Sequence, residues 1–98
     1  MATWSVLTGR RLKSGTYDEW RKAWQPDEWP QGVRAYILRK IDDPDEVIAF
    51  GLWEGTREGL EAMRPDADTE RARHERMAPF VEQQFADGAY EVVEIVEG

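Results

Sequence analysis

The chain has 98 residues, the size of one domain, and its 41% hydrophobic content is enough for a core. Its net charge of −7 argues against nucleic acid as a partner, because phosphates require a basic surface. The lack of cysteine excludes disulfides and thiolate metal sites, and no apolar run approaches the ~20 residues of a membrane span. We therefore expect one soluble, cytoplasmic domain over residues 1–98, without a signal peptide.

The first predicted elements are a strand and an aromatic helix. The strand is Trp4–Leu12, and its basic end, Arg10–Lys13, is predicted to be solvated rather than a binding patch. Thr16 and Glu19 then form a capping-box pattern. Aromatic residues follow at the spacing of one helix face: Tyr17, Trp20 and Trp24. The loop QPDEWPQG ends this helix, and its Trp29 is expected to fold back over the core.

A hairpin is predicted next. Its strands are Val33–Ile41 and Val47–Trp53, joined by the turn Asp42–Glu46. The second strand, VIAFGLW, has no polar residue, whereas a strand with one wet face alternates apolar and polar residues. Both faces of this strand are therefore expected to be covered.

The second half of the chain predicts a short helix and a longer one. Thr56 is expected to cap the short helix, and Asp66 or Asp68 the longer one. The longer helix is expected to run to about Phe85, kinked or split at Pro79. Its buried stripe is predicted to be His74, Met77, Val81 and Phe85.

A last strand, Ala89–Val96, completes the order β-α-β-β-α-β, a ferredoxin-like α+β layout with a four-stranded antiparallel sheet. Two helices cover one face of such a sheet and leave the other bare. Each strand nevertheless carries neighbouring apolar residues that point to opposite faces: Val6 and Leu7, Tyr36 and Ile37, Ile48 and Ala49, Val92 and Val93. We therefore predict a homodimer in which two sheets stack into one barrel.

The element order, the apolar third strand leading into WEGTREGLEAM, and a helix ending in MAPFVE resemble the antibiotic biosynthesis monooxygenase family. This family belongs to the dimeric α+β barrel superfamily, and the resemblance covers nearly the whole chain. It implies a pocket between sheet and helices in each subunit. Some members oxidise aromatic polyketides with molecular oxygen and without metal or flavin, others degrade haem, and others have no known reaction.

Haem degradation is not expected. The haem-degrading members carry an asparagine on strand one, a tryptophan on the short helix and a histidine on the long helix. The first two positions fall at Thr8 and Met63. The third falls near Ala72, and His74 lies two residues further on, which turns a helical side chain by ~200°.

The resemblance therefore implies a cofactor-independent monooxygenase that acts on a hydrophobic aromatic, polyketide- or quinol-like metabolite. The alternative is a non-catalytic small-molecule-binding or structural dimeric barrel. No phosphate-binding glycine loop, zinc helix motif or nucleophile elbow is present, so we expect no cofactor.

His74 is the candidate proton acceptor, because it is the single histidine and such a group titrates near neutrality. The other interpretation is a structural histidine paired with Glu70 or Glu75. The candidate substrate-binding residues are Thr8, Trp20, Trp24 and Tyr36. The two tryptophans can also be simple core, and the tyrosine can also pack in the dimer seam.

Overall fold

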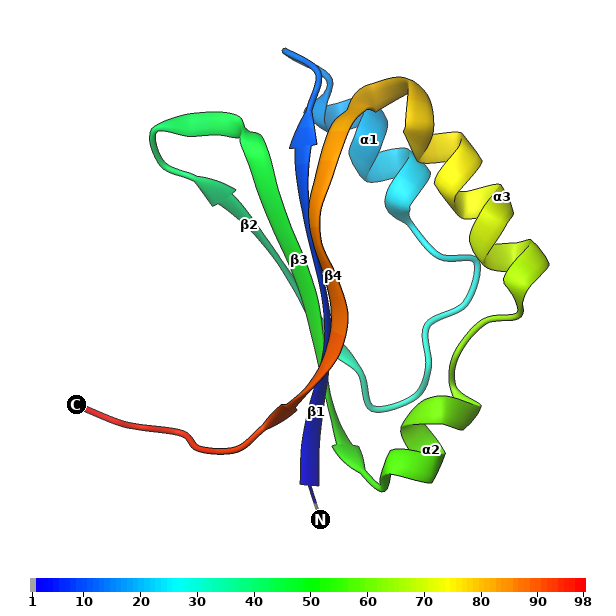
Figure 1. Ribbon diagram of the computed structural model, residues 1–98, viewed down its shortest axis with the longest axis vertical. Helices are drawn as coiled ribbons and strands as arrows, with labels where there is room; N and C mark the ends of the chain where they lie inside the picture. The colour runs from blue at the N-terminus through cyan, green and yellow to red at the C-terminus, as the bar shows by residue number, and fades with distance from the viewer. Residues whose placement is uncertain (1) are drawn as a thin grey trace.

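The computed structural model describes residues 2–98 as one antiparallel sheet with all helices on one side (Figure 1). The elements are β1 (Ala2–Leu12), α1 (Tyr17–Trp24), β2 (Arg34–Lys40), β3 (Asp43–Gly55), α2 (Arg57–Ala62), α3 (Ala67–Met77), a 3₁₀ turn (Ala78–Phe80) and β4 (Val81–Val92). The strand order is β2-β3-β1-β4, and every neighbouring pair is antiparallel. The predicted ferredoxin-like α+β fold is confirmed.

The strand register sorts the side chains onto a helix face and an open face. Thr8 pairs with Ala49, and Ala49 pairs with Ile37, so these side chains share the helix face. Leu7 and Tyr36 both pair with Phe50 on the open face. The run VIAFGLW therefore supplies Val47 and Ala49 to the core under the helices. Trp53 lies on the same face, whereas Ile48, Phe50 and Leu52 lie on the open face. This alternation explains why the strand contains no polar residue.

The core lies between the helices and the end of β1. Its buried members are Leu12, Trp20, Trp24, Val47, Ala49 and Met77. Trp20 is 0% exposed, and its ring centroid lies 6.1 Å from that of Trp24. Trp29 folds back onto Trp24, with ring centroids 5.6 Å apart, as predicted for the loop. The aromatic stripe of α1 is therefore core.

Two of the three predicted helix caps form. The side chain of Thr56 accepts the backbone N–H of Gly59 at 3.0 Å, and that of Asp66 accepts the backbone N–H of Thr69 at 2.8 Å. The predicted capping box at Thr16 is wrong. Its hydroxyl is 2.7 Å from the carbonyl oxygen of Lys13 and makes no side-chain cap, and its φ/ψ of −106°/16° is not the extended conformation of an N-cap.

The prediction of a long helix to Phe85 is wrong. Helix α3 ends at Met77, because Pro79 has no N–H to continue the helical hydrogen bonds. The chain then forms β4 from Val81 and pairs with β1 across a register shift near Arg10. The last strand therefore begins and ends earlier than Ala89–Val96.

The cap on α3 gives a pH-dependent prediction. The carboxylate of Asp66 accepts hydrogen bonds from the backbone N–H and then the hydroxyl of Thr69, and these lower the pKa of Asp66. A lowered pKa stabilises the fold above the ordinary aspartate value of about 3.9, and this stability is lost as the pH falls through the lower folded-state value. Asp66→Ala should therefore lower the melting temperature at pH 7, by an amount that shrinks as the pH falls below about 3.9.

The control for this cap is Asp68→Ala, which removes the other candidate cap. Asp68 is exposed, and its carboxylate contacts Arg71 at 2.8 Å. Asp68→Ala should therefore lower the melting temperature less than Asp66→Ala does. Thermal unfolding followed by circular dichroism from pH 2 to 7 checks both. Equal losses for the two variants, or a loss at Asp66 that does not depend on pH, would contradict the assignment.

Candidate functional site

The helix layer leaves the middle of the sheet uncovered. Helices α1 and α3 lie together at one end of the sheet and α2 lies at the other (Figure 1). Between them, Val6 on the helix face of β1 is 46% exposed, and its partner Ala89 on β4 is also exposed. The next pair along the strands is Thr8 and Asp87. We call these four residues the uncovered strip, and it is accessible to a small molecule.

A hollow of about 340 Å³ lies at the α2 end of the uncovered strip. It is lined by Trp4, Arg57, Leu60, Glu61, Arg64 and Ala89. The indole of Trp4 is held in place because its Nε1–H donates to the carbonyl oxygen of Gly55 at 3.0 Å. The lining is apolar toward the sheet, and its rim carries the exposed Arg57–Glu61 pair, 3.4 Å apart. Its volume is at the lower end of the range for small-molecule sites.

Arg10 lies at the opposite end of the uncovered strip and is 3% exposed. The prediction that this basic cluster is solvated is therefore wrong for Arg10, although Arg11 does lie on the open face, where it pairs with Asp43. The Nη1 of Arg10 donates to Oγ1 of Thr8 at 2.9 Å. The signal for its position was its alternation with Leu12, a core residue two positions along the same strand.

The electrostatics around Arg10 come from α3 and β4. Burial lowers the pKa of Arg10, the positive charge of Arg73 lowers it further, and the carboxylates of Asp87 and Glu70 oppose this effect. An arginine nevertheless stays charged in proteins. Across residues 2–98, no carboxylate lies within the 4.0 Å ion-pair distance of the Arg10 guanidinium.

Glu70 connects His74 to this region. The Nε2 of His74, whose side chain is 49% exposed, is 3.4 Å from Oε2 of Glu70, and Nη1 of Arg73 is 3.7 Å from Oε1. Arg73 also donates from Nε to the carbonyl oxygen of Trp24 at 2.6 Å, which fixes α3 to α1. Glu70 therefore pairs with both His74 and Arg73, and its negative charge also opposes the lowering of the Arg10 pKa.

The structure brings only some of the predicted site residues together. Thr8 lies in the uncovered strip, and His74 pairs with Glu70 on α3. Trp20 and Trp24 are buried in the core. Tyr36 lies on the open face, stacked on Phe50 at 5.1 Å, and is therefore separated from the other four by the sheet.

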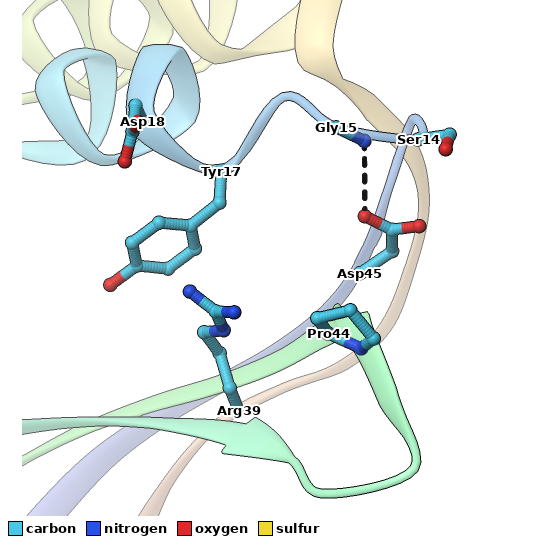
Figure 2. Close-up of a pocket in the computed structure, with 7 residues that line it drawn as sticks. All are labelled: Ser14, Gly15, Tyr17, Asp18, Arg39, Pro44 and Asp45. Atoms are coloured by element: carbon cyan, nitrogen blue, oxygen red, sulfur yellow. Dashed lines mark hydrogen bonds between the residues drawn. The ribbon is translucent and has the colours of Figure 1, made fainter.

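A second hollow, of about 400 Å³, lies between the start of α1 and the β2–β3 hairpin (Figure 2). Two of its charged groups are already engaged, because the Arg39 guanidinium lies 4.7 Å from the centre of the Tyr17 ring and Asp45 accepts the N–H of Gly15 at 3.2 Å. The left-handed φ of +73° at Gly15 places this N–H in the turn. The hollow is open to solvent, so we favour the uncovered strip as the functional site.

Within residues 2–98, no group of three or more histidine, aspartate or glutamate side chains is placed to hold a metal ion. No helix in this range has both the length and the apolar content needed to cross a membrane.

Two solved structures share this architecture over nearly the whole chain. A protein from Chloroflexus aurantiacus J-10-fl, provisionally named an antibiotic biosynthesis monooxygenase, has a TM-score of 0.65 at 15% identity and covers 98% of this chain and 96% of its own. A Bordetella bronchiseptica protein with the same provisional name has a TM-score of 0.64 at 10% identity and covers 98% and 100%. No family model and no curated protein matches the sequence. The comparisons thus confirm the resemblance at the level of the fold.

Proposed function

We propose that the protein is a homodimeric monooxygenase of the antibiotic biosynthesis monooxygenase family that oxidises a hydrophobic aromatic metabolite with molecular oxygen. The observation that carries the proposal is the uncovered strip, an accessible surface between α2 and the α1–α3 pair that is apolar at Val6 and Ala89, in a fold shared with two proteins of that provisional name. We also propose a cytoplasmic location, since a chain without cysteine has no need of an oxidising compartment.

The proposed chemistry needs no metal or flavin. An anthrone- or quinol-like substrate that loses a proton becomes electron-rich enough to reduce oxygen itself. Conversion of a ring CH₂ to C=O takes one oxygen atom from O₂ into the product, and the other leaves as water with the two hydrogens. The protein supplies an apolar surface, a proton acceptor and positive charge near the developing oxyanion.

We assign the proton acceptor to His74 and an oxyanion contact to the hydroxyl of Thr8. His74 is supported by its carboxylate partner Glu70, which can stabilise the charged imidazolium after proton transfer. Thr8 is supported by its position in the uncovered strip beside Arg10. We leave Tyr36 outside the site, because it lies across the sheet from these groups.

Oxygen consumption with a panel of anthrones and quinols tests the proposal. With the anthrones we expect uptake of one O₂ per substrate, and with ¹⁸O₂ we expect one labelled atom in the product by mass spectrometry. Binding of these compounds without oxygen uptake would overturn the proposal and favour a non-catalytic binding protein. That alternative is supported by Trp20, Trp24 and Met77, which fill the space between the helices and one end of the sheet.

His74→Ala should lower kcat by about 10²- to 10⁴-fold on a substrate found in this panel, the contribution of a positioned general base. The melting temperature should change little, because the His74 side chain is half exposed and its one ion-pair partner within residues 2–98 is Glu70. Glu75→Ala, the exposed neighbouring residue on α3, is the control and should keep full turnover. Unchanged turnover in His74→Ala would remove His74 from the mechanism.

The homodimer in this proposal is supported by the open face of the sheet. The large apolar side chains exposed on this face are Tyr36, Leu38, Phe85 and Tyr90. Burial of each such side chain is worth about 1.5–3 kcal/mol. The segment after Val92 also leaves the body on the open side of the sheet (Figure 1) and carries exposed Val93, Ile95 and Val96. A second copy stacked on the open face would cover these surfaces.

A further inference from the structure

We propose that Arg10 binds the anionic oxygen of an aromatic ligand, a carboxylate or a phenolate, whose ring lies over Val6 and Ala89. This inference rests on the proposed function only in placing a small molecule on the helix face. It concerns the chemistry that the ligand must carry, and it applies equally to a substrate and to a ligand that is bound without reaction.

The charge of Arg10 has no ion-pair partner within residues 2–98. A guanidinium has five N–H donors, and within residues 2–98 this one donates a single side-chain hydrogen bond, to Thr8. The residue is nevertheless 3% exposed. A buried charge without an ion-pair partner is costly, and buried arginines are normally paired with carboxylates or phosphates. A ligand oxygen would supply the missing partner.

The Arg10 side chain is also directed toward the uncovered strip. The hydrogen bond to Thr8 turns the guanidinium back along β1, toward the middle of the sheet. The next helix-face residue is Val6, about 7 Å further along the strand, and it is 46% exposed. A planar ring attached to the bound oxygen would therefore cover Val6 and its partner Ala89.

The charged neighbours of Arg10 have other partners or face water. Arg73 is already committed, because it donates to the carbonyl of Trp24 and pairs with Glu70. Asp87 sits across from Thr8 and is exposed to water, beyond ion-pair distance of Arg10. Arg10 is thus the free cation of this group, and Asp87 is the carboxylate that would compete with a ligand for it.

Binding of 2-naphthoate and of its neutral analogue 2-naphthamide tests the proposal. Affinities are followed by tryptophan fluorescence, and the arginine Nε–H signals by NMR. We expect the wild-type protein to bind naphthoate at least tenfold more tightly than the amide, with one arginine signal shifting. Arg10→Gln should abolish this preference, whereas Arg71→Gln, the same charge change on an exposed α3 residue, should keep it. Equal affinities for the two probes in the wild type, or a preference that survives Arg10→Gln, would overturn the proposal.

Two further variants cover the case in which Arg10→Gln does not fold. Arg10→Lys should retain part of the preference, and Asp87→Asn should strengthen naphthoate binding severalfold by removing the competing carboxylate. If Asp87→Asn instead leaves naphthoate affinity unchanged and only lowers the melting temperature, Arg10 is a structural partner of Asp87 and the proposal fails. Oxygen uptake is not measured in these experiments, so failure of the oxidation chemistry and failure of the anion site are distinguishable.

Discussion

Trp20→Ala should lower the free energy of unfolding by about 3–5 kcal/mol, the usual loss for truncating a buried large aromatic residue. Trp20 is the largest fully buried side chain of the described residues, and its ring contacts Tyr17 and Trp24. Because domains of this size are stable by only about 5–15 kcal/mol, the change removes a large part of the total. Urea unfolding followed by circular dichroism measures it.

Two comparison variants sharpen this experiment. Trp29→Ala removes the same type of side chain from the edge of the cluster, where the ring contacts Trp24 and is partly exposed, so we expect less than half the loss. Trp20→Phe should also lose less than Trp20→Ala. It keeps an aromatic ring and removes the Nε1–H, which has no hydrogen-bond partner within residues 2–98. Equal losses for Trp20→Ala and Trp29→Ala would show that the core lies elsewhere.

The fold was predictable where local patterns and tertiary packing agree. Short runs of apolar residues predicted the strands, and the spacing of Trp20 and Trp24 predicted the buried face of α1. The pattern failed at Val81–Phe85, where apolar residues four apart fit a helix face. Pro79 ends the helix before this segment, and pairing with β1 makes the segment a strand. That pairing is a long-range interaction, so no local spacing of residues reveals it.

The candidate site was harder to predict, because alternation along a strand assigns two faces without saying which one meets the helices. Tyr36 and Arg10 illustrate this limit. Tyr36 was considered for the pocket and lies on the open face, whereas Arg10 was expected in water and lies buried on the helix face. The sequence shows that Arg10 and Leu12, two residues apart on one strand, share a face. Charged residues are rarely buried, however, so this position was not expected for an arginine.

Leu38→Glu should convert the protein from a dimer to a monomer at micromolar concentration, with a dissociation constant raised at least 100-fold. Leu38 lies on the open face of β2 and is 48% exposed in a single copy. A two-fold axis places the changed residue in the interface twice, so each substitution introduces two carboxylates. A carboxylate buried there without a partner loses its hydration, which costs far more than the apolar contact contributes.

Val6→Glu is the matched control for this experiment. Val6 is 46% exposed, nearly the same as Leu38, but it lies on the helix face, which the proposed partner does not cover. Sedimentation velocity should therefore find a dimer for the wild type and for Val6→Glu, and a monomer for Leu38→Glu. A folded wild-type monomer at micromolar concentration would contradict the homodimer. Dissociation of both variants would contradict the assignment of the interface to the open face. Because the two positions differ mainly in the face they occupy, the comparison tests which layer of the sheet meets the second copy.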